Sequence, residues 1–219
     1  MKNHIKIISF ILLILVSLSF IDFKNSKQFV VVLDAGHGGK DKGTIGYNDL
    51  QEKEVNLSIA LVTKFLINKY DSNIKVILTR DNDVFIPLKK RSEIAKYFQA
   101  DLFISIHADY NPNKNAKGIA IFIEKNIHSK KYKIDNYRKS LIFGLKLNNI
   151  LTKKVNMKSR GILFKNLSVL RNTLNHMPSV LLEVGFISNR EEALFFEKKG
   201  KKALAYSLSK AIIEYKNNE

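Results

Sequence analysis

The stretch at residues 31–43 constrains the fold most, because a run of apolar residues stops abruptly in a glycine-rich turn. Residues 31–33 read Val-Val-Leu, and Asp34 is followed by Ala-Gly-His-Gly-Gly, which places His37 inside the turn. The run predicts a buried strand, and the glycines predict a tight turn at its carboxyl end. Open α/β sheets bind ligands just outside the carboxyl ends of their strands. The sequence therefore predicts that His37 lies in a functional site.

Two later apolar runs end in polar side chains in the same way. Residues 103–106 read Phe-Ile-Ser-Ile before His107, and residues 180–182 read Val-Leu-Leu before Glu183. Because the carboxyl ends of parallel strands meet at one edge of a sheet, we expect both side chains to approach His37 there.

Strands and helices alternate through most of the chain. This alternation predicts one α/β domain over residues 28–217, with a mostly parallel twisted sheet of about six strands and helices on both faces. The expected strands are residues 28–34, 73–79, 101–107, 118–124, 167–171 and 179–184. The expected helices are residues 52–70, 87–99, 136–151 and 202–215, with a further one that opens at a capping box over residues 188–191.

The first 21 residues have the pattern of an export signal. Lys2 and Lys6 precede an apolar run at residues 7–21, as in a secretory signal peptide. The run is shorter than the ~20 residues that span a bilayer comfortably, but an uncleaved membrane anchor remains the alternative. Either form predicts an exported protein, located in the periplasm or cell wall or anchored to the membrane.

Composition narrows the chemistry. The chain has no cysteine, which excludes disulfides, thiolate metal ligands and thiol nucleophiles. Its formal net charge of +17 suggests contact with anionic envelope polymers, although a lysine- and asparagine-rich composition can also reflect biased codon usage. Nucleic-acid binding is disfavoured, because the chain has an export signal and lacks clustered aromatic and basic motifs.

Glu183 interrupts an otherwise apolar run. Burying an unpaired carboxylate is costly, so this side chain needs a cation, a strong hydrogen-bond partner or a raised pKa. One explanation is a buried ion pair with Arg80 or Arg171. A functional role is favoured, because the position at a strand end and the chemistry agree.

Two imidazoles and one carboxylate form a catalytic zinc set with one open position for water, and a further carboxylate can act as general base. His37, His107, Glu52 and Glu183 can fill these four roles. For Glu52 the competing interpretation is a capping box with Asp49 as N-cap. Either histidine could also be a structural residue of a turn or of the core.

Over about residues 29–215 the chain resembles the zinc-dependent N-acetylmuramoyl-L-alanine amidases of bacterial cell-wall metabolism. Any one motif could arise by chance, but all of them in order form a specific signal. In chain order the motifs are Leu33–Asp41, Glu52–Leu57, Leu78–Asp83, Pro87-Leu88 with Arg91, Ser105–Ala108, Ser168–Arg171, Met177-Pro178 and Leu182–Asn189.

The resemblance implies that His37, Glu52 and His107 bind Zn2+ and that Glu183 is the catalytic carboxylate. It also implies that the substrate is peptidoglycan, cut at the amide between the lactyl group of N-acetylmuramic acid and L-alanine. Asp109 stands where the family commonly has asparagine, which adds a negative charge near the metal. Two other functions stay open: a zinc peptidase that cuts the stem peptide, and a non-catalytic cell-wall-binding protein.

The N-terminal pattern gives a test of location. We expect the mature protein outside the cytoplasmic membrane, because the basic residues and the apolar run direct export. Fractionation of native cells with a specific antibody measures this. A soluble cytoplasmic pool of full length would contradict the prediction, whereas a full-length membrane-bound form would identify the segment as an anchor.

Overall fold

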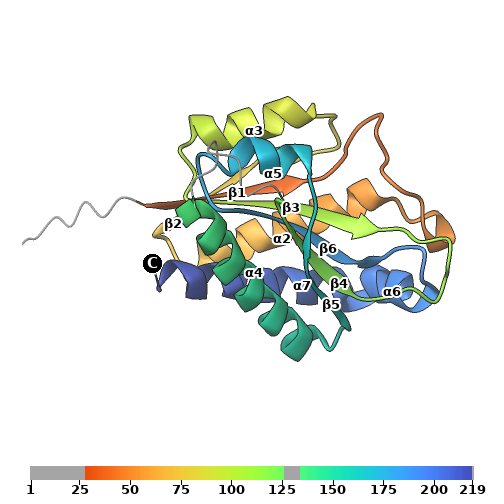
Figure 1. The fold of residues 1–219 in the computed structure, drawn as a ribbon. Helices are drawn as coiled ribbons and strands as arrows, with labels where there is room; N and C mark the ends of the chain where they lie inside the picture. Colours follow the sequence, from red (N-terminus) through yellow and green to blue (C-terminus); the bar gives the residue numbers. More distant parts are fainter. Residues whose placement is uncertain (1–27, 126–133, 219) are drawn as a thin grey trace, which may run out of the picture.

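The computed structural model describes residues 28–125 and 134–218, which form one six-stranded sheet between two helical layers (Figure 1). The strands are β1 (Phe29–Ala35), β2 (Ile74–Leu78), β3 (Leu102–Asp109), β4 (Ile119–Ile123), β5 (Ser159–Phe164) and β6 (Ser179–Phe186). The helical elements are η1 (Tyr47–Asp49), α2 (Glu52–Tyr70), α3 (Leu88–Tyr97), α4 (Ile134–Val155), α5 (Ser168–Thr173), α6 (Arg190–Phe195), η2 (Phe196–Gly200) and α7 (Lys201–Lys216).

The sheet has the strand order β2-β1-β3-β6-β4-β5. Strands β2, β1, β3 and β6 run parallel, whereas β4 pairs antiparallel with β6 and parallel with β5. The predicted fold, a mostly parallel sheet of six strands with helices on both faces, is therefore confirmed. The carboxyl ends of β1, β3 and β6 share one edge, and the first residues of β4 and β5 lie at this same edge.

Two apolar layers cover the sheet. Val31 and Leu33 of β1 face the larger core under α2, α4 and α7, while Val30 and Val32 face a smaller core with α3 and α5 (Figure 1). Residues on both sides of each central strand are thus removed from water, which is why these strands read as continuous apolar runs rather than as alternating patterns.

Two local predictions are wrong. Residues 167–171, expected as a strand, begin helix α5, and the sixth strand is β5 instead. In α5 the buried residues Val169, Leu170 and Thr173 follow helical spacing, which a five-residue window does not reveal. Strand β5 pairs only with β4, has mostly half-buried residues and is interrupted by Gly161, so it carries little of the usual apolar signal.

The capping box expected at residues 188–191 is displaced by one residue. Asn189 is the N-cap of α6, and its side-chain oxygen accepts a hydrogen bond from the Glu192 amide at 3.1 Å. The predicted helix is present, but Glu192 and not Glu191 occupies the third position of its first turn.

The described residues include no helix long and apolar enough to cross a membrane. The expected signal or anchor at residues 1–21 lies outside the described residues and stays a prediction, as do the bounds 28–217 of the catalytic domain.

A buried ion pair joins the strand ends beneath the functional edge. Asp34 accepts hydrogen bonds from Arg91 Nη1, Thr79 Oγ1 and Ser105 Oγ, each at 2.7 Å. Both Asp34 and Arg91 are almost fully buried. The pair therefore connects β1 with β3, with α3 and with the residue that follows β2.

We expect Asp34→Ala to lower the free energy of unfolding by about 3–5 kcal/mol, because it leaves the Arg91 guanidinium buried without its charge partner. Urea unfolding of the purified protein measures the loss. Asp81→Ala, at an exposed position on the loop after β2, is the matched control and should change stability by no more than about 0.5 kcal/mol. Equal effects of the two substitutions would contradict this role for Asp34.

Candidate metal centre

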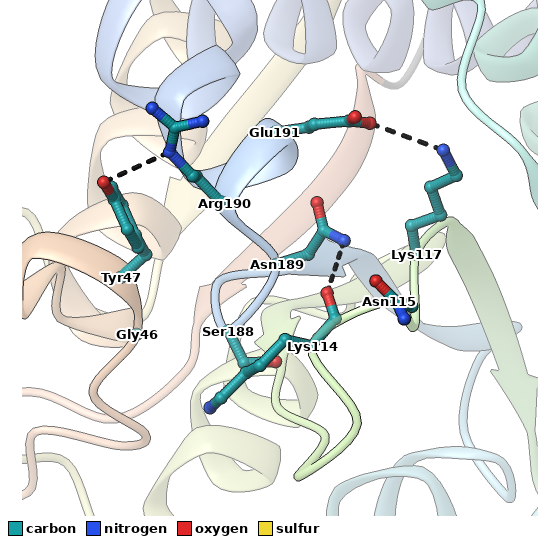
Figure 2. Close-up of a pocket in the computed structure, with 9 residues that line it drawn as sticks. All are labelled: Gly46, Tyr47, Lys114, Asn115, Lys117, Ser188, Asn189, Arg190 and Glu191. Atoms are coloured by element: carbon teal, nitrogen blue, oxygen red, sulfur yellow. Dashed lines mark hydrogen bonds and ion pairs between the residues drawn. The ribbon is translucent and has the colours of Figure 1, made fainter.

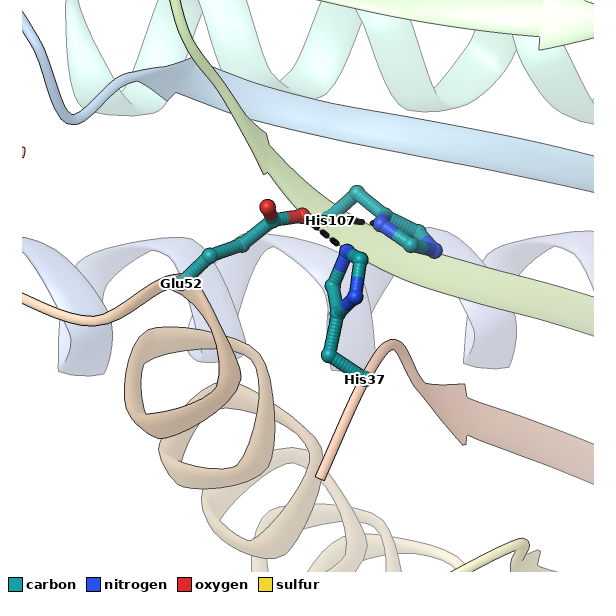
Figure 3. Close-up of side chains that lie close together, drawn as sticks. All are labelled: His37, Glu52 and His107. Atoms are coloured by element: carbon teal, nitrogen blue, oxygen red, sulfur yellow. Dashed lines mark hydrogen bonds and ion pairs between the residues drawn. The ribbon is translucent and has the colours of Figure 1, made fainter. Parts of the chain in front are cut away.

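The three predicted metal ligands converge at the carboxyl edge of the sheet (Figure 3). His37 lies in the loop after β1, Glu52 is the first residue of α2, and His107 lies near the end of β3. Glu52 Oε1 is 2.8 Å from His107 Nδ1 and 3.1 Å from His37 Nε2. One donor atom from each residue lies within 4.8 Å of the other two. A fold that brings two imidazoles and a carboxylate this close offers a ready set of metal donors.

Glu52 does not cap its helix. Helix α2 begins after Gln51, and Asp49 belongs to the separate turn η1, so the capping-box interpretation is wrong. The second carboxylate oxygen of Glu52, Oε2, accepts hydrogen bonds from the Thr44 amide at 2.9 Å and the Thr44 hydroxyl at 3.2 Å. The loop thereby fixes one carboxylate oxygen and turns the other toward the imidazoles.

The backbone of the His37 loop is in the left-handed region. His37 has φ +62°, and Gly38 and Gly39 follow with φ +128° and +58°. This conformation is uncommon for a residue with a side chain and persists where the surroundings hold it. His37 Nδ1 donates to Asp41 Oδ2 at 2.9 Å. A carboxylate on one ring nitrogen orients the ring and leaves the other nitrogen for a metal.

Two glycines leave the space that the donor group occupies. A Cβ atom on Gly36 would collide with the His107 ring, and one on Gly43 would lie 2.6 Å from Glu52 Oε2 and 2.7 Å from the His37 ring. Because no side chain fits at either position, Gly36 and Gly43 allow the three donor residues to pack closely.

The electrostatics suit a cation. Burial alone disfavours charge on these side chains, but the hydrogen bonds and charges of the two imidazoles outweigh it and hold the pKa of Glu52 well below its ordinary value. Burial lowers the pKa of His37 and of His107, yet their contacts with Glu52 outweigh this effect and raise both pKa values. The group thus favours positive charge at its centre, and the residues present fit a divalent metal.

Glu183 lies beside this group. It pairs in register with His107 across β3 and β6. Within the described residues its buried Oε2 atom has no hydrogen-bond partner, and burial is the main cause that raises its pKa to about 7. The alternative of an ion pair with Arg80 or Arg171 is wrong: Arg80 donates to backbone carbonyls, and Arg171 donates to Asn166.

Arg160, which the sequence did not indicate as a site residue, lies at the same end of the sheet. Arg160 on β5 donates through Nη1 to Asp109 at 2.9 Å and through Nε to the Gly118 carbonyl at 3.0 Å. Its Nη2 atom is buried and has no partner among the described residues. The guanidinium of Arg160 therefore neutralises the negative charge of Asp109 near the three donor residues. Because residues 159–164 were not predicted as a strand, the sequence did not place Arg160 near the donor residues.

Two further arginines hold the His37 loop by its backbone. Arg80 donates to the carbonyls of Gly36 and Lys53, at 2.9 and 2.8 Å, and Arg91 donates to the carbonyl of His37 at 2.8 Å. Both belong to the motifs of the sequence, but their role was not apparent there, because main-chain contacts leave no trace in residue spacing.

A His-Glu-His donor group at the strand ends of an α/β sheet, with a spare carboxylate beside it, is the arrangement of a metal-dependent hydrolase. A family model described as N-acetylmuramoyl-L-alanine amidase matches residues 31–214. The chain belongs to this family of peptidoglycan hydrolases and is an enzyme of that class.

Individual relatives agree. A putative N-acetylmuramoyl-L-alanine amidase of Buchnera aphidicola subsp. Baizongia pistaciae is 32% identical and aligns with 85% of this chain and 95% of its own length. AmiA of Escherichia coli K12 is 32% identical over 88% of this chain and 78% of its own length. A putative amidase of Buchnera aphidicola subsp. Acyrthosiphon pisum is 40% identical, over 60% of this chain and 56% of its own length.

Solved structures show the same fold. The catalytic domain of CwlV from Bacillus (Paenibacillus) polymyxa is 32% identical with a TM-score of 0.76, covering 87% of this chain and 99% of that domain. An amidase from Clostridium difficile 630 is 28% identical with a TM-score of 0.79, covering 89% and 100%. The predictions of fold, family and enzyme class are confirmed, whereas the roles of individual residues stay predictions.

The donor geometry predicts how zinc binding depends on pH. Both imidazoles must lose a proton to bind a metal, and their raised pKa values keep those protons bound to higher pH than in an ordinary histidine site. We therefore expect zinc affinity to weaken as pH falls from slightly alkaline through neutral, with protons released on binding. Calorimetric zinc titrations of metal-free protein in buffers of different ionisation enthalpy measure both. Zinc affinity that is constant across neutral pH, without proton release, would contradict this donor set.

Proposed function

We propose that this chain binds zinc through His37, Glu52 and His107 and hydrolyses the amide between N-acetylmuramic acid and L-alanine in peptidoglycan. The observation that carries the proposal is the convergence of the three donors beside Glu183, whose Oε2 atom lacks a partner within the described residues. Family membership supports both the metal and the bond.

The chemistry divides between the metal and one carboxylate. When bound, zinc supplies a Lewis acid that polarises the scissile carbonyl and makes water a nucleophile at neutral pH. Glu183 Oε2 accepts a proton from the attacking water and passes it to the nitrogen of L-alanine as the carbon–nitrogen bond breaks. Burial raises the pKa of Glu183 to about 7, so both forms are accessible near neutral pH. Asp41 keeps the His37 ring oriented throughout.

An apolar cavity offers a place for one part of the substrate. It has a volume of about 410 Å³ and reaches His37 and His107, and its walls include Phe85, Leu88 and Val169. Its arginine, Arg91, is buried and already donates to Asp34 and to backbone carbonyls. Its two carboxylates also have partners, since Asp34 accepts from Arg91 and Asp41 accepts from His37. The remaining surface is mainly apolar and suits uncharged groups, such as the lactyl and N-acetyl methyls of the sugar.

The same proposal includes export by the segment at residues 1–21 and attraction of the basic protein to anionic envelope polymers. The charge of +17 supports the second point.

Digestion of purified peptidoglycan identifies the bond. We expect new amino termini of L-alanine and intact glycan strands, because zinc held by His37, Glu52 and His107 would activate water for attack on an amide carbonyl. Mass analysis of the fragments, with end-group labelling, measures this. New amino termini only within the stem peptide would establish the peptidase alternative, and new reducing sugar ends would indicate a glycosidase. Binding without cleavage in the presence of zinc would establish the wall-binding alternative.

Glu183→Gln separates the base from the metal. The substitution keeps the shape and removes the proton acceptor, so we expect turnover to fall by roughly two to four orders of magnitude. Zinc should stay bound, because the three donors are unchanged, and thermal unfolding should show a folded protein. Turnover, zinc content and unfolding are measured on the same preparation.

His37→Ala is the matched comparison, and it should lose zinc and activity together. A folded, zinc-loaded Glu183→Gln protein with near-normal activity would remove Glu183 from the mechanism.

A further inference from the structure

Lys53 carries a charge into the interior beside the donor group, and the proposed mechanism does not use it. It is the second residue of α2, directly after Glu52, and it is 8% exposed. Its Nζ atom donates to the Asp83 carboxylate at 2.6 Å and to the Gly39 carbonyl at 3.0 Å. Burying an ammonium group is costly unless such partners hold it. The two contacts therefore fix Lys53 in one place.

Asp83 completes the contact from the loop between β2 and α3. Its Oδ2 atom accepts from Lys53, and its Oδ1 atom accepts from the Gly39 amide at 2.8 Å. A single ion pair, here called the Lys53–Asp83 pair, thus binds both main-chain groups of Gly39. The two loops also pack directly together, because a Cβ atom on Gly39 would lie 2.8 Å from the Phe85 nitrogen.

Gly39 belongs to the turn that orients the His37 ring. The Gly38 amide donates to the Asp41 carbonyl at 2.8 Å, and the Asp41 amide donates to the Gly38 carbonyl at 3.1 Å. The Asp41 carboxylate in turn accepts from His37 Nδ1. A shift of Gly39 therefore moves the carboxylate that sets the direction of the imidazole.

The Lys53–Asp83 pair is a short connection between two of the three donors. Gly39 is two residues after His37, and Lys53 is next to Glu52. The backbone from His37 to Gly39 is left-handed, and such a conformation persists where its surroundings hold it. A contact on this backbone therefore controls where His37 lies relative to Glu52.

We infer that Lys53 and Asp83 are positioning residues for the metal group. Their ion pair holds Gly39 against the first turn of α2 and so sets the separation of His37 and Glu52 that a metal ion requires. The inference rests on the proposed function, since it takes His37 and Glu52 as metal donors. Neither residue of the pair belongs to the donor group, so their replacement acts on zinc affinity and not on the proton transfer.

Zinc affinity is the first measurement. Asp83→Ala removes both acceptors, and Lys53→Met keeps the buried stem without its charge, so we expect each to weaken zinc binding roughly tenfold. Asp83 is 54% exposed, so its replacement leaves the core intact. Competition with a chromogenic chelator measures the affinity at a temperature where thermal unfolding shows each variant to be folded. Asp83→Asn keeps an acceptor for the Gly39 amide and should recover most of the loss. Unchanged zinc affinity in Asp83→Ala would overturn the inference.

The double variant tests whether the two side chains act as one unit. Because both hold Gly39 through the same ion pair, Lys53→Met/Asp83→Ala should weaken zinc binding no more than the stronger single substitution does. Two losses that multiply would show independent effects and would overturn the role of the pair.

Two other ion pairs supply matched controls. Lys216 Nζ lies 3.0 Å from Asp71, at the opposite end of α2, so Lys216→Met removes a partly buried pair from the same helix. Lys117 Nζ lies 3.4 Å from Glu191 and joins the β3–β4 loop to α6 beside a cavity of about 740 Å³ (Figure 2). That cavity shares no lining residue with the donor group. Both Lys216→Met and Lys117→Met should leave zinc affinity unchanged. A loss in either control equal to that in Lys53→Met would show an effect of charge or stability alone and would overturn the inference.

Amide hydrogen exchange in metal-free protein, measured by NMR, gives a readout that needs no zinc. The amides of Gly38 and Asp41 bond within their own turn and not to Asp83, so faster exchange there reports movement of the turn. We expect exchange at both amides to accelerate in Asp83→Ala and to stay unchanged in Lys216→Met. Equal exchange in Asp83→Ala and wild-type protein would overturn the inference. Wild-type protein that binds no zinc would overturn the proposed function instead, and the exchange rates would still decide whether the pair holds the turn.

Discussion

The ion pair between Asp34 and Arg91 is the contact on which the functional edge of this protein depends. Asp34 is buried where β1 ends, and it accepts hydrogen bonds from side chains that follow β2, lie on β3 and lie on α3. A buried carboxylate with this many donors is costly to leave unmatched and therefore specifies one arrangement of its partners. The strand ends that carry His37 and His107 are thus held together by a pair that lies beside the three donor residues and is not one of them.

Arg80 and Arg91 extend this arrangement to the donors themselves. Their guanidinium groups bind the carbonyls of the His37 loop, and Arg80 also binds the carbonyl of Lys53, next to Glu52. The left-handed conformation of His37 is thus maintained by backbone contacts that do not use its side chain. The His37 imidazole and the Glu52 carboxylate therefore stay available for a metal. The distance between them is set by residues outside the donor group.

The sequence predicted the part of the structure that depends on apolar runs. Buried parallel strands give continuous apolar segments, and the polar residues that end them, His37, His107 and Glu183, were placed at one edge by topology alone. The failures have a different origin. The edge strand β5 is half-buried and contains a glycine, so its pattern is weak, and α5 is too short to show a helical period.

Two features of the site depend on tertiary contacts. The sequence left Glu52 open between a helix cap and a metal ligand, and the path of the loop at residues 41–51 excludes the cap and turns one carboxylate oxygen toward the imidazoles. The contacts of Arg160 with Asp109 and Gly118 join residues far apart in the chain. Residue spacing does not predict such contacts, because they depend on how the β3–β4 loop packs against β5.

The register of β3 and β6 places Glu183 opposite His107, and among the described residues its Oε2 atom has no hydrogen-bond partner. His107 and Glu183 are paired, but the register shifts directly afterwards, before Asp109 meets Phe186. A bulge of this kind bends a strand and re-aims its side chains. Beyond the shift Asp109 pairs with Phe186, and its side chain accepts a hydrogen bond from Arg160. Arg160 is held by Asp109, and its charge opposes but does not outweigh the rise in the pKa of Glu183 that burial causes. The carboxylate keeps the raised pKa that burial gives it, which is the property that a base working near neutral pH requires.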